Sequence, residues 1–263
     1  ELPEARAVPH PLPSDSSRRP ARRPAPLSGA ETDFNTMATT RTVPACKLVI
    51  FDKDGTLLDS ISAFAPLVER CASDLQDVVE PERFMSCLGY SPADKSFSSD
   101  SVFMTAPSDE IVSCVRTQLG DDAADGYAAW FEALPPDQTA GRALAPLAPL
   151  MTSFKNAGIQ IAVLTNDERR FTEAFLREES VLDLVSFMVC CDDGLPGKPS
   201  AVPALKLCEM AGVLPEAAAI VGDSSRDVGC GLAADLGTVI GVTTGLQSEA
   251  ELMAAGADMV LAD

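Results

Sequence analysis

The segment Leu48-Val49-Ile50-Phe51-Asp52-Lys53-Asp54-Gly55-Thr56 joins a short apolar run to an acidic turn. The run is too short for a helix, and its wholly apolar character is typical of a strand buried on both faces of a parallel sheet. Two carboxylates, Asp52 and Asp54, follow directly, and Gly55 allows the backbone to turn sharply. Acidic groups beside a buried strand are costly unless a cation or protons compensate them. The segment therefore predicts a first strand with a site for a hard cation such as Mg²⁺ at its end.

Similar apolar runs recur downstream and alternate with helical patterns. This alternation predicts an α/β fold, a doubly wound parallel sheet whose functional groups lie at the carboxyl ends of the strands. The expected strands are Cys46–Phe51, Ile159–Leu164, Val185–Cys190, Ala217–Val221 and Thr238–Val242, and the expected helices span 143–157, 167–179, 200–212 and 225–235.

The interval from 60 to 140 breaks this rhythm, because it shows helical patterns and no strand pattern. Helices are expected over Ile61–Val79, Ser108–Leu119 and Asp121–Leu134, with Gly120 and Gly126 as helix ends. We therefore predict a helical cap domain at 60–140, inserted into a core domain formed by 37–59 and 141–263.

Residues 1–36 are rich in proline and arginine, a composition that predicts a disordered leader. Met37 has the character of a translation start, so the leader is interpreted as an extension, with an organelle-targeting role left open.

Charge and residue content narrow the classes of function. The chain of 263 residues is 46% hydrophobic, enough for a sizeable core, and carries a formal net charge of −19. This charge disfavours nucleic acid and anionic membrane surfaces as partners, and no apolar run is long enough to span a bilayer. The only histidine is His10, so chemistry based on a histidine base or histidine metal ligands is excluded for the core.

Eight cysteines are present, and none forms a Cys-x-x-Cys pair. Their spacing fits neither a zinc site nor a disulfide framework. Reduced, buried thiols and a cytoplasmic location are the interpretation we prefer.

Polar residues follow three further strands or turns. Thr165 and Asn166 end the second predicted strand and can hydrogen-bond an oxyanion, while Lys198 lies in a turn. Asp223 ends the fourth predicted strand, and Asp227 follows one helical turn later, on the same side. Each signal has a structural alternative, namely a solvated turn, a helix cap or a surface lysine. Their joint occurrence at strand ends favours a functional site.

In this order, the motifs resemble the haloacid dehalogenase-like hydrolase superfamily over about residues 46–263. The similarity is greatest to its phosphoglycolate phosphatase-like branch, which implies a Rossmann-like core with a helical cap. The motifs are Asp52-Lys53-Asp54-Gly55-Thr56, Thr165, Lys198 and Gly222-Asp223-Ser224-Ser225-Arg226-Asp227.

The resemblance implies a Mg²⁺-dependent phosphatase that acts on a small phosphate monoester. Asp52 would be the nucleophile that becomes an aspartyl-phosphate, and Asp54 the general acid and then base. Thr165, Asn166 and Lys198 would hold the phosphoryl group. The metal would be held by Asp52, the backbone carbonyl of Asp54 and Asp223, with Asp227 as a supporting partner. The ester is not identified; phosphoglycolate, a sugar phosphate and a nucleotide all fit, and the oligomeric state is open.

Three other functions remain compatible with the sequence. A phosphomutase uses the same two aspartates, and a catalytically silent relative would serve in binding or regulation. Hydrolysis of a C–P bond would need a cap lysine, for which Lys95 is the candidate. The loop with Tyr90 and Lys95 could face the site, although we expect Tyr90 to pack and Lys95 to be solvated. Trp130-Phe131 is expected in the cap core.

Overall fold

A parallel sheet organises the part of the chain that the computed structural model describes, residues 45–139 and 141–262. The strand order is β5-β4-β1-β6-β7-β8, and Leu48 is in register with Gln160 on one side and with Ala218 on the other. The predicted leader, 1–36, lies outside the described residues. The strands are β1 (Leu48–Phe51), β4 (Gln160–Leu164), β5 (Phe187–Val189), β6 (Ala218–Gly222), β7 (Thr238–Val242) and β8 (Met259–Leu261).

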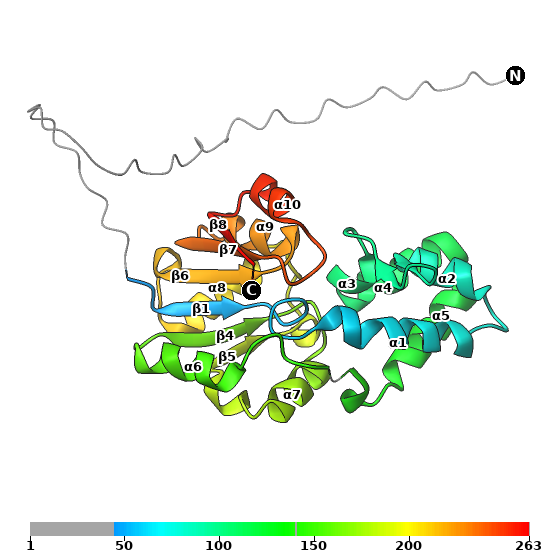
Figure 1. Ribbon diagram of the computed structural model, residues 1–263, viewed down its shortest axis with the longest axis horizontal. Helices are drawn as coiled ribbons and strands as arrows, with labels where there is room; N and C mark the ends of the chain where they lie inside the picture. The colour runs from blue at the N-terminus through cyan, green and yellow to red at the C-terminus, as the bar shows by residue number, and fades with distance from the viewer. Residues whose placement is uncertain (1–44, 140, 263) are drawn as a thin grey trace, which may run out of the picture. The chain divides into compact units, whose positions relative to one another are not determined.

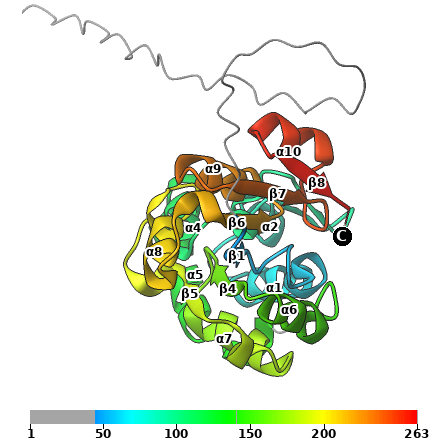
Figure 2. The same ribbon diagram turned by 90° about the vertical axis from the view of Figure 1, so that its left-hand side faces the viewer.

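Helices cover both faces of this sheet (Figures 1 and 2). Because side chains alternate along a strand, Val49 and Phe51 join the buried cluster that includes α6 and α7, while Leu48 and Ile50 join the cluster with α8 and α9. This arrangement confirms the predicted doubly wound α/β fold. The helices are α6 (Leu147–Asn156), α7 (Arg169–Glu178), α8 (Val202–Ala211), α9 (Ser225–Ala233) and α10 (Glu249–Ala255).

A group of helices is inserted between β1 and β4, beside the carboxyl ends of the strands (Figure 1). The two connections of the insertion are joined by an antiparallel bridge between Leu58 and Ala143. The helical cap is therefore present, and its boundaries at 60 and 140 stay a prediction. Its elements are α1 (Ser60–Asp74), α2 (Pro81–Cys87), β2 (Tyr90–Ser91), β3 (Ser96–Phe97), α3 (Val102–Thr105), α4 (Ser108–Leu119) and α5 (Asp121–Glu132).

Several details of the sequence prediction are wrong. The cap interval contains a short antiparallel hairpin, β2–β3, although no strand was expected there. Gly126 lies inside α5 rather than at a helix end. A Cβ at this position would come within 3.1 Å of Leu75, so the glycine allows α5 to pack closely against that side chain. Helices α2 and α10 and the edge strand β8 were not expected, since their apolar patterns are short.

Local capping fixes the helices that begin at the site. Ser224 precedes α9 and forms a reciprocal capping box with Asp227, which satisfies two backbone N–H groups of the first turn. At the start of α1, the Asp59 carboxylate accepts a hydrogen bond from the Ser62 N–H at 3.2 Å. Both caps are polar residues placed directly after core strands or turns, so the sequence sets where these helices begin.

Two further predictions concern the chain as a whole. All eight cysteines have free thiols, and five of them are buried. Within the residues that the structure describes, no helix combines the length and the apolar character required to cross a bilayer.

Candidate active site

Asp52 lies at the carboxyl end of β1, where it is 6% exposed. The Lys198 ammonium lies 2.7 Å from its Oδ1 atom. Burial, followed by the Asp227 carboxylate, raises the pKa of Asp52 to about 7, although Lys198 opposes the shift. With its pKa raised to this range, the buried Asp52 carboxylate needs either a bound proton or a nearby cation to compensate its negative charge.

Asp54, two residues further on, is held by its neighbour Lys53. The buried Lys53 ammonium lies 2.6 Å from the Asp54 carboxylate and 2.8 Å from that of Asp167, which follows β4. Burial raises the pKa of Asp54, and the Lys53 charge opposes this rise. Although burial alone would lower the pKa of Lys53, the Asp167 and Asp54 carboxylates raise it above its usual value. Lys53 is therefore an ammonium ion that positions Asp54.

Lys198 occupies the opposite side of Asp52 and is 3% exposed. Its ammonium contacts the carboxylates of Asp52 and Asp227, each at 2.7 Å. Burial lowers the pKa of Lys198, but the Asp227 and Asp52 carboxylates outweigh that effect and raise it. The turn is anchored because the Lys198 N–H donates to the Asn166 side chain at 2.9 Å. Lys198 is thus a fixed positive charge beside the nucleophile candidate.

The buried carboxylates of Asp52, Asp223 and Asp227 form a cluster that fits a cation. One oxygen of each lies within 4.8 Å of the others. Asp223 is 9% exposed, and burial, followed by the Asp52 charge, raises its pKa well above the usual range. Asp227 already accepts hydrogen bonds from Lys198 and from the Ser224 hydroxyl. Hard oxygen ligands with excess negative charge suit a divalent cation, with Asp52 and Asp223 as the carboxylates freer to ligate it.

Two glycines leave room for Asp223. A Cβ at Gly55 would lie 2.3 Å from the Asp223 carboxylate, and one at Gly245, in the loop after β7, would lie 1.6 Å from it. The Thr244 hydroxyl also donates to the Gly55 carbonyl at 2.6 Å, which ties that loop to the turn after β1. The loop after β7 is therefore part of the site, and the sequence analysis did not identify it.

Thr165 and Asn166 lie at the end of β4, as predicted from the sequence. Thr165 is 2% exposed, and its hydroxyl accepts a hydrogen bond from the Asp167 N–H at 3.0 Å. The Asn166 amide donates to the Thr105 carbonyl of the cap at 2.9 Å. Asn166 thus links the core to the cap, while Thr165 borders the cavity beside Asp52.

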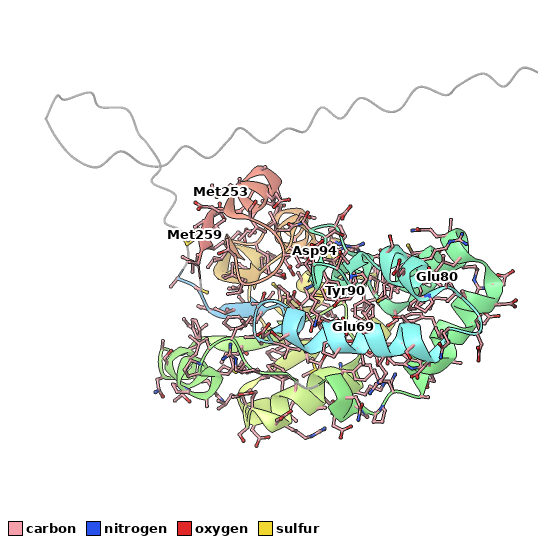
Figure 3. The ribbon with its side chains drawn as sticks, turned by 45° about the vertical axis from the view of Figure 1, so that its right-hand side comes forward. Glu69, Glu80, Tyr90, Asp94, Met253 and Met259 are labelled. Atoms are coloured by element: carbon pink, nitrogen blue, oxygen red, sulfur yellow. The ribbon has the colours of Figure 1, made fainter. Side chains whose placement is uncertain are left out.

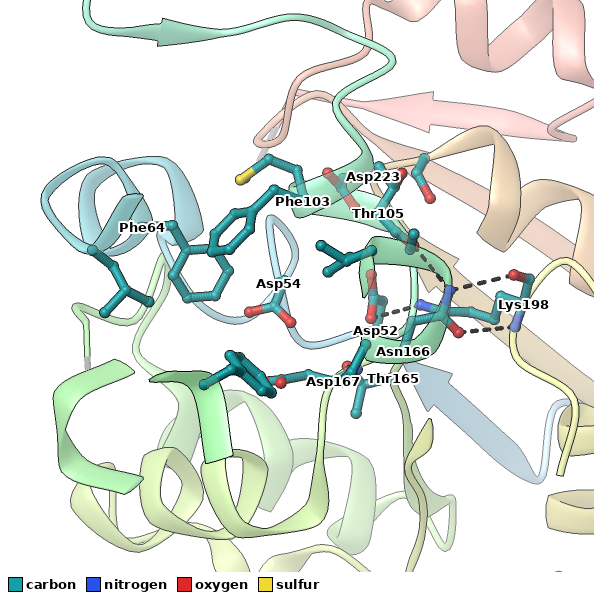
Figure 4. Close-up of a pocket in the computed structure, with 17 residues that line it drawn as sticks. Asp52, Asp54, Phe64, Phe103, Thr105, Thr165, Asn166, Asp167, Lys198 and Asp223 are labelled. Atoms are coloured by element: carbon teal, nitrogen blue, oxygen red, sulfur yellow. Dashed lines mark hydrogen bonds and ion pairs between the residues drawn. The ribbon is translucent and has the colours of Figure 1, made fainter. Parts of the chain in front are cut away.

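The cap closes one side of a cavity of about 50 Å³ above these residues. Figure 4 shows Phe64 and Phe103 on one side of this cavity and Lys198 on the other. The two aromatic rings pack edge to face, with centroids 5.8 Å apart. All the predicted core site residues except Asp227 border this cavity, and Asp227 lies directly behind Lys198.

Cap residues singled out from the sequence behave in different ways. Tyr90 is buried, packs on Phe97 with ring centroids 4.9 Å apart, and donates to Glu69 at 2.6 Å (Figure 3). Lys95 is exposed, as expected. Phe131 packs in the cap, but it also borders the cavity, so the expectation of a purely structural role is incomplete.

The sequence analysis missed Lys53 and Asp167 as parts of the site. A signal was present, because the two carboxylates after β1 required a compensating cation and Lys53 lies between them. Asp167 carries no such signal, since its role depends on β4 lying beside β1.

Comparison with known proteins shows the family. Residues 46–235 match the family described as haloacid dehalogenase-like hydrolase. The chain belongs to this family. The expectation of a hydrolytic enzyme is therefore confirmed, and the two curated relatives described next are named as phosphatases.

Two curated relatives illustrate the range of names. An N-acetylmuramic acid 6-phosphate phosphatase from Pseudomonas aeruginosa is 26% identical, over 70% of this chain and 76% of the relative. A phosphoglycolate phosphatase from Chromobacterium violaceum is 27% identical, over 72% of this chain and 81% of the relative.

Solved structures share the fold of this haloacid dehalogenase-like hydrolase. One from Haemophilus somnus, described as a predicted phosphoglycolate phosphatase, has a TM-score of 0.63 at 22% identity and covers 83% of this chain and 94% of its own. Another from Thermotoga maritima, assigned as a β-phosphoglucomutase, has a TM-score of 0.59 at 19% identity, with 82% and 94% covered.

Proposed function

We propose that this chain is a Mg²⁺-dependent phosphatase that hydrolyses a small phosphate monoester through an aspartyl-phosphate on Asp52. The observation that carries the proposal is that Asp52 contacts the Lys198 ammonium, at 2.7 Å, and also belongs to a cluster with the carboxylates of Asp223 and Asp227. A phosphoryl group at Asp52 would therefore meet both a fixed positive charge and a site for a cation. Offsetting the charge of the transferring group is the main requirement of phosphoryl transfer.

In the first step, an Asp52 oxygen attacks phosphorus while the bond to the leaving oxygen breaks. Protonated Asp54 gives its proton to that oxygen, so the alcohol leaves neutral. Burial supports this role, because it raises the pKa of Asp54 and favours the protonated acid. In the second step, Asp54 takes a proton from water, the water oxygen attacks phosphorus, and the bond to Asp52 breaks to release inorganic phosphate.

Other residues hold the reacting group in place. Lys198 and the Thr165 hydroxyl border the cavity beside Asp52 and can donate to the phosphoryl oxygens. Asp52, the Asp54 carbonyl and Asp223 would ligate Mg²⁺, and Asp227 would support them through Lys198. When bound, Mg²⁺ offsets the negative charge of the carboxylates and of the phosphoryl group.

Phosphate release from p-nitrophenyl phosphate tests the proposal. Wild-type activity should need Mg²⁺ and disappear in EDTA, and Asp52→Asn should lower kcat/KM by at least about a thousandfold. Asp122→Asn, which removes an exposed carboxylate on α5, is the matched control and should retain full activity. Metal-dependent activity that survives in Asp52→Asn would contradict the proposal. Transfer of phosphate within hexose phosphates, without release, would indicate a phosphomutase.

The role of Asp54 has its own test. Asp54→Asn removes the general acid, so kcat/KM should fall more for an alkyl phosphate than for p-nitrophenyl phosphate, whose leaving group needs little protonation. An equal loss for both esters would show that Asp54 does not protonate the leaving group.

A further inference from the structure

The cap side of the active-site cavity is apolar. Six side chains form this wall: Phe64 and Leu67 from α1, Phe103 and Met104 from α3, Ile111 from α4 and Phe131 from α5. The remaining cap side chains at the cavity, those of Thr105, Ala106 and Ser108, are uncharged. A leaving group attached to a phosphoryl at Asp52 would face this wall, because the core residues occupy the other side (Figure 4).

The cations of the core near the cavity are already paired. Lys198 is shared between Asp52 and Asp227, each at 2.7 Å. Lys53 is shared between Asp54 and Asp167, at 2.6 and 2.8 Å. Both ammonium groups therefore serve the carboxylates of the core and the transferring phosphoryl group.

Two arginines at the core–cap boundary are also paired with carboxylates. Arg226 pairs with Glu110 of the cap at 2.7 Å, and Arg170 pairs with Glu168 at 2.7 Å. The Lys53 ammonium lies 5.7 Å from the ring centroid of Phe64, and the Arg170 guanidinium lies 5.6 Å from that of Phe131, but neither residue borders the cavity, whose charged lining consists of Lys198 and four aspartates. A leaving group with its own carboxylate would be buried near the Asp167 carboxylate, while the nearby cations are already paired with carboxylates of the protein, which is unfavourable.

The size of the cavity adds a second limit. At about 50 Å³ it is far smaller than the roughly 150 Å³ apolar cavity that holds benzene. In this arrangement of cap and core, the space beyond the phosphoryl position favours a leaving group of only a few heavy atoms, and hydrolysis of a bulkier ester such as p-nitrophenyl phosphate requires the cap to move.

We infer that the substrate is a phosphate monoester whose leaving group is small, uncharged and at least partly apolar, such as a short-chain alcohol. This inference rests on the proposed phosphatase function and specifies its substrate class. Phosphoglycolate, for which several relatives are named, carries a carboxylate on the leaving group and is then a poor substrate.

Three esters of matched shape test the inference. Phosphoglycolate, phosphoglycolamide and isobutyl phosphate have leaving groups with the same number of heavy atoms, but only the first is charged. With Mg²⁺, kcat/KM for isobutyl phosphate should exceed that for phosphoglycolate by at least tenfold, and the amide should lie between them. A ratio below ten would overturn the inference.

A change of charge in the wall should reverse the preference. Met104→Lys places a cation opposite the catalytic aspartates, and it should shift the ratio toward phosphoglycolate by at least tenfold. Met104→Leu keeps an apolar side chain of similar size, so its ratio should stay within about twofold of the wild type. If Met104→Lys does not fold, the ratio of kcat/KM for isobutyl phosphate to that for phosphoglycolate in the wild type is sufficient to test the inference.

The outcomes separate the two proposals. Hydrolysis that depends on Mg²⁺ and Asp52, with phosphoglycolate as the best of the three esters, would overturn the substrate class and leave the phosphatase standing. Absence of hydrolysis of all three esters and of p-nitrophenyl phosphate, by folded protein with Mg²⁺, would overturn both.

Discussion

Lys53 is a buried ammonium between two carboxylates that come from different strands. It is 1% exposed, and Asp54 and Asp167 lie on either side of it. Removing one member of a buried group of charges lowers stability by more than the ion pairing contributed, because an uncompensated charge stays buried. The stability of the loop after β1 therefore depends on this lysine, independently of any role in catalysis.

We expect Lys53→Met to lower the free energy of unfolding by about 3 kcal/mol, measured by urea denaturation. Adding Asp167→Asn removes one of the two unpaired carboxylates and should recover about 1 kcal/mol. Lys95→Met, at an exposed position, is the control and should change stability by less than about 0.5 kcal/mol. Equal losses in the single and the double variant would show that charge pairing is not the cause.

Asp52 predicts a dependence of stability on pH in the metal-free protein. Its pKa rises from 3.8 to about 7 on folding, so the folded state binds the proton more tightly. The associated stability is fully present below pH 3.8 and is lost as the pH rises through about 7. In EDTA, Asp52→Asn should therefore raise Tm by a few degrees at pH 8, and the gain should shrink toward pH 5. A variant less stable than the wild type at pH 8 would contradict this assignment.

At the scale of elements, Arg170 joins α7 of the core to the end of α5 in the cap. Its guanidinium donates to the carbonyls of Phe131, Glu132 and Leu134, at 2.8, 3.1 and 2.8 Å. These carbonyls belong to the last turn and exit of α5, and that of Phe131 also accepts from the Leu134 N–H at 3.1 Å. The same group stacks on Phe171, 4.2 Å from the ring centroid, so one side chain both caps a helix and packs.

Arg170→Lys keeps the charge but loses the planar fork that reaches several carbonyls at once. We expect it to cost about 2 kcal/mol, seen as a lower midpoint in thermal unfolding. Arg177→Lys on the exposed side of α7 is the matched control and should stay within about 0.5 kcal/mol, because its partner Glu173 is a surface ion pair. A similar loss in both variants would argue against the capping role.

Helices and strands with a long sequence pattern were predicted well. Short elements, whose positions depend on packing against distant segments, were predicted poorly. The strands β1, β4, β6 and β7 and the helices α4 and α9 were predicted to within a few residues, because the strands are continuous apolar runs and the helices carry a helical pattern. The hairpin β2–β3 and strand β8 have two or three residues each, too few for a period to show. Gly126 was misassigned because its role depends on a neighbouring helix rather than on its own.

The site shows the same division. Residues that follow directly from strand ends, such as Asp52, Thr165 and Asp223, were predicted, because parallel strands bring their carboxyl ends to one edge of the sheet. Gly245 and the apolar wall on the cap were not, because both are created by contacts between segments far apart in the chain.

At the scale of the whole molecule, a cation that binds only the folded state should stabilise it. At a Mg²⁺ concentration of about 100 times Kd, the gain is about 2.7 kcal/mol, which corresponds to roughly 5–10 °C in Tm. Thermal unfolding with and without Mg²⁺ measures this shift. Asp223→Asn should abolish the shift, whereas Asp122→Asn should preserve it. An unchanged shift in Asp223→Asn would place the cation elsewhere.

The position of β1 in the sheet has a consequence for how the protein is made. Leu48 pairs with Gln160 and with Ala218, so the central strand is synthesised first and its two neighbours appear only much later. At typical rates of translation, on the order of 5–20 residues per second, this apolar strand leaves the ribosome well before it has a partner. The segment that carries the proposed nucleophile is thus the one that nascent-chain chaperones would need to shield the longest.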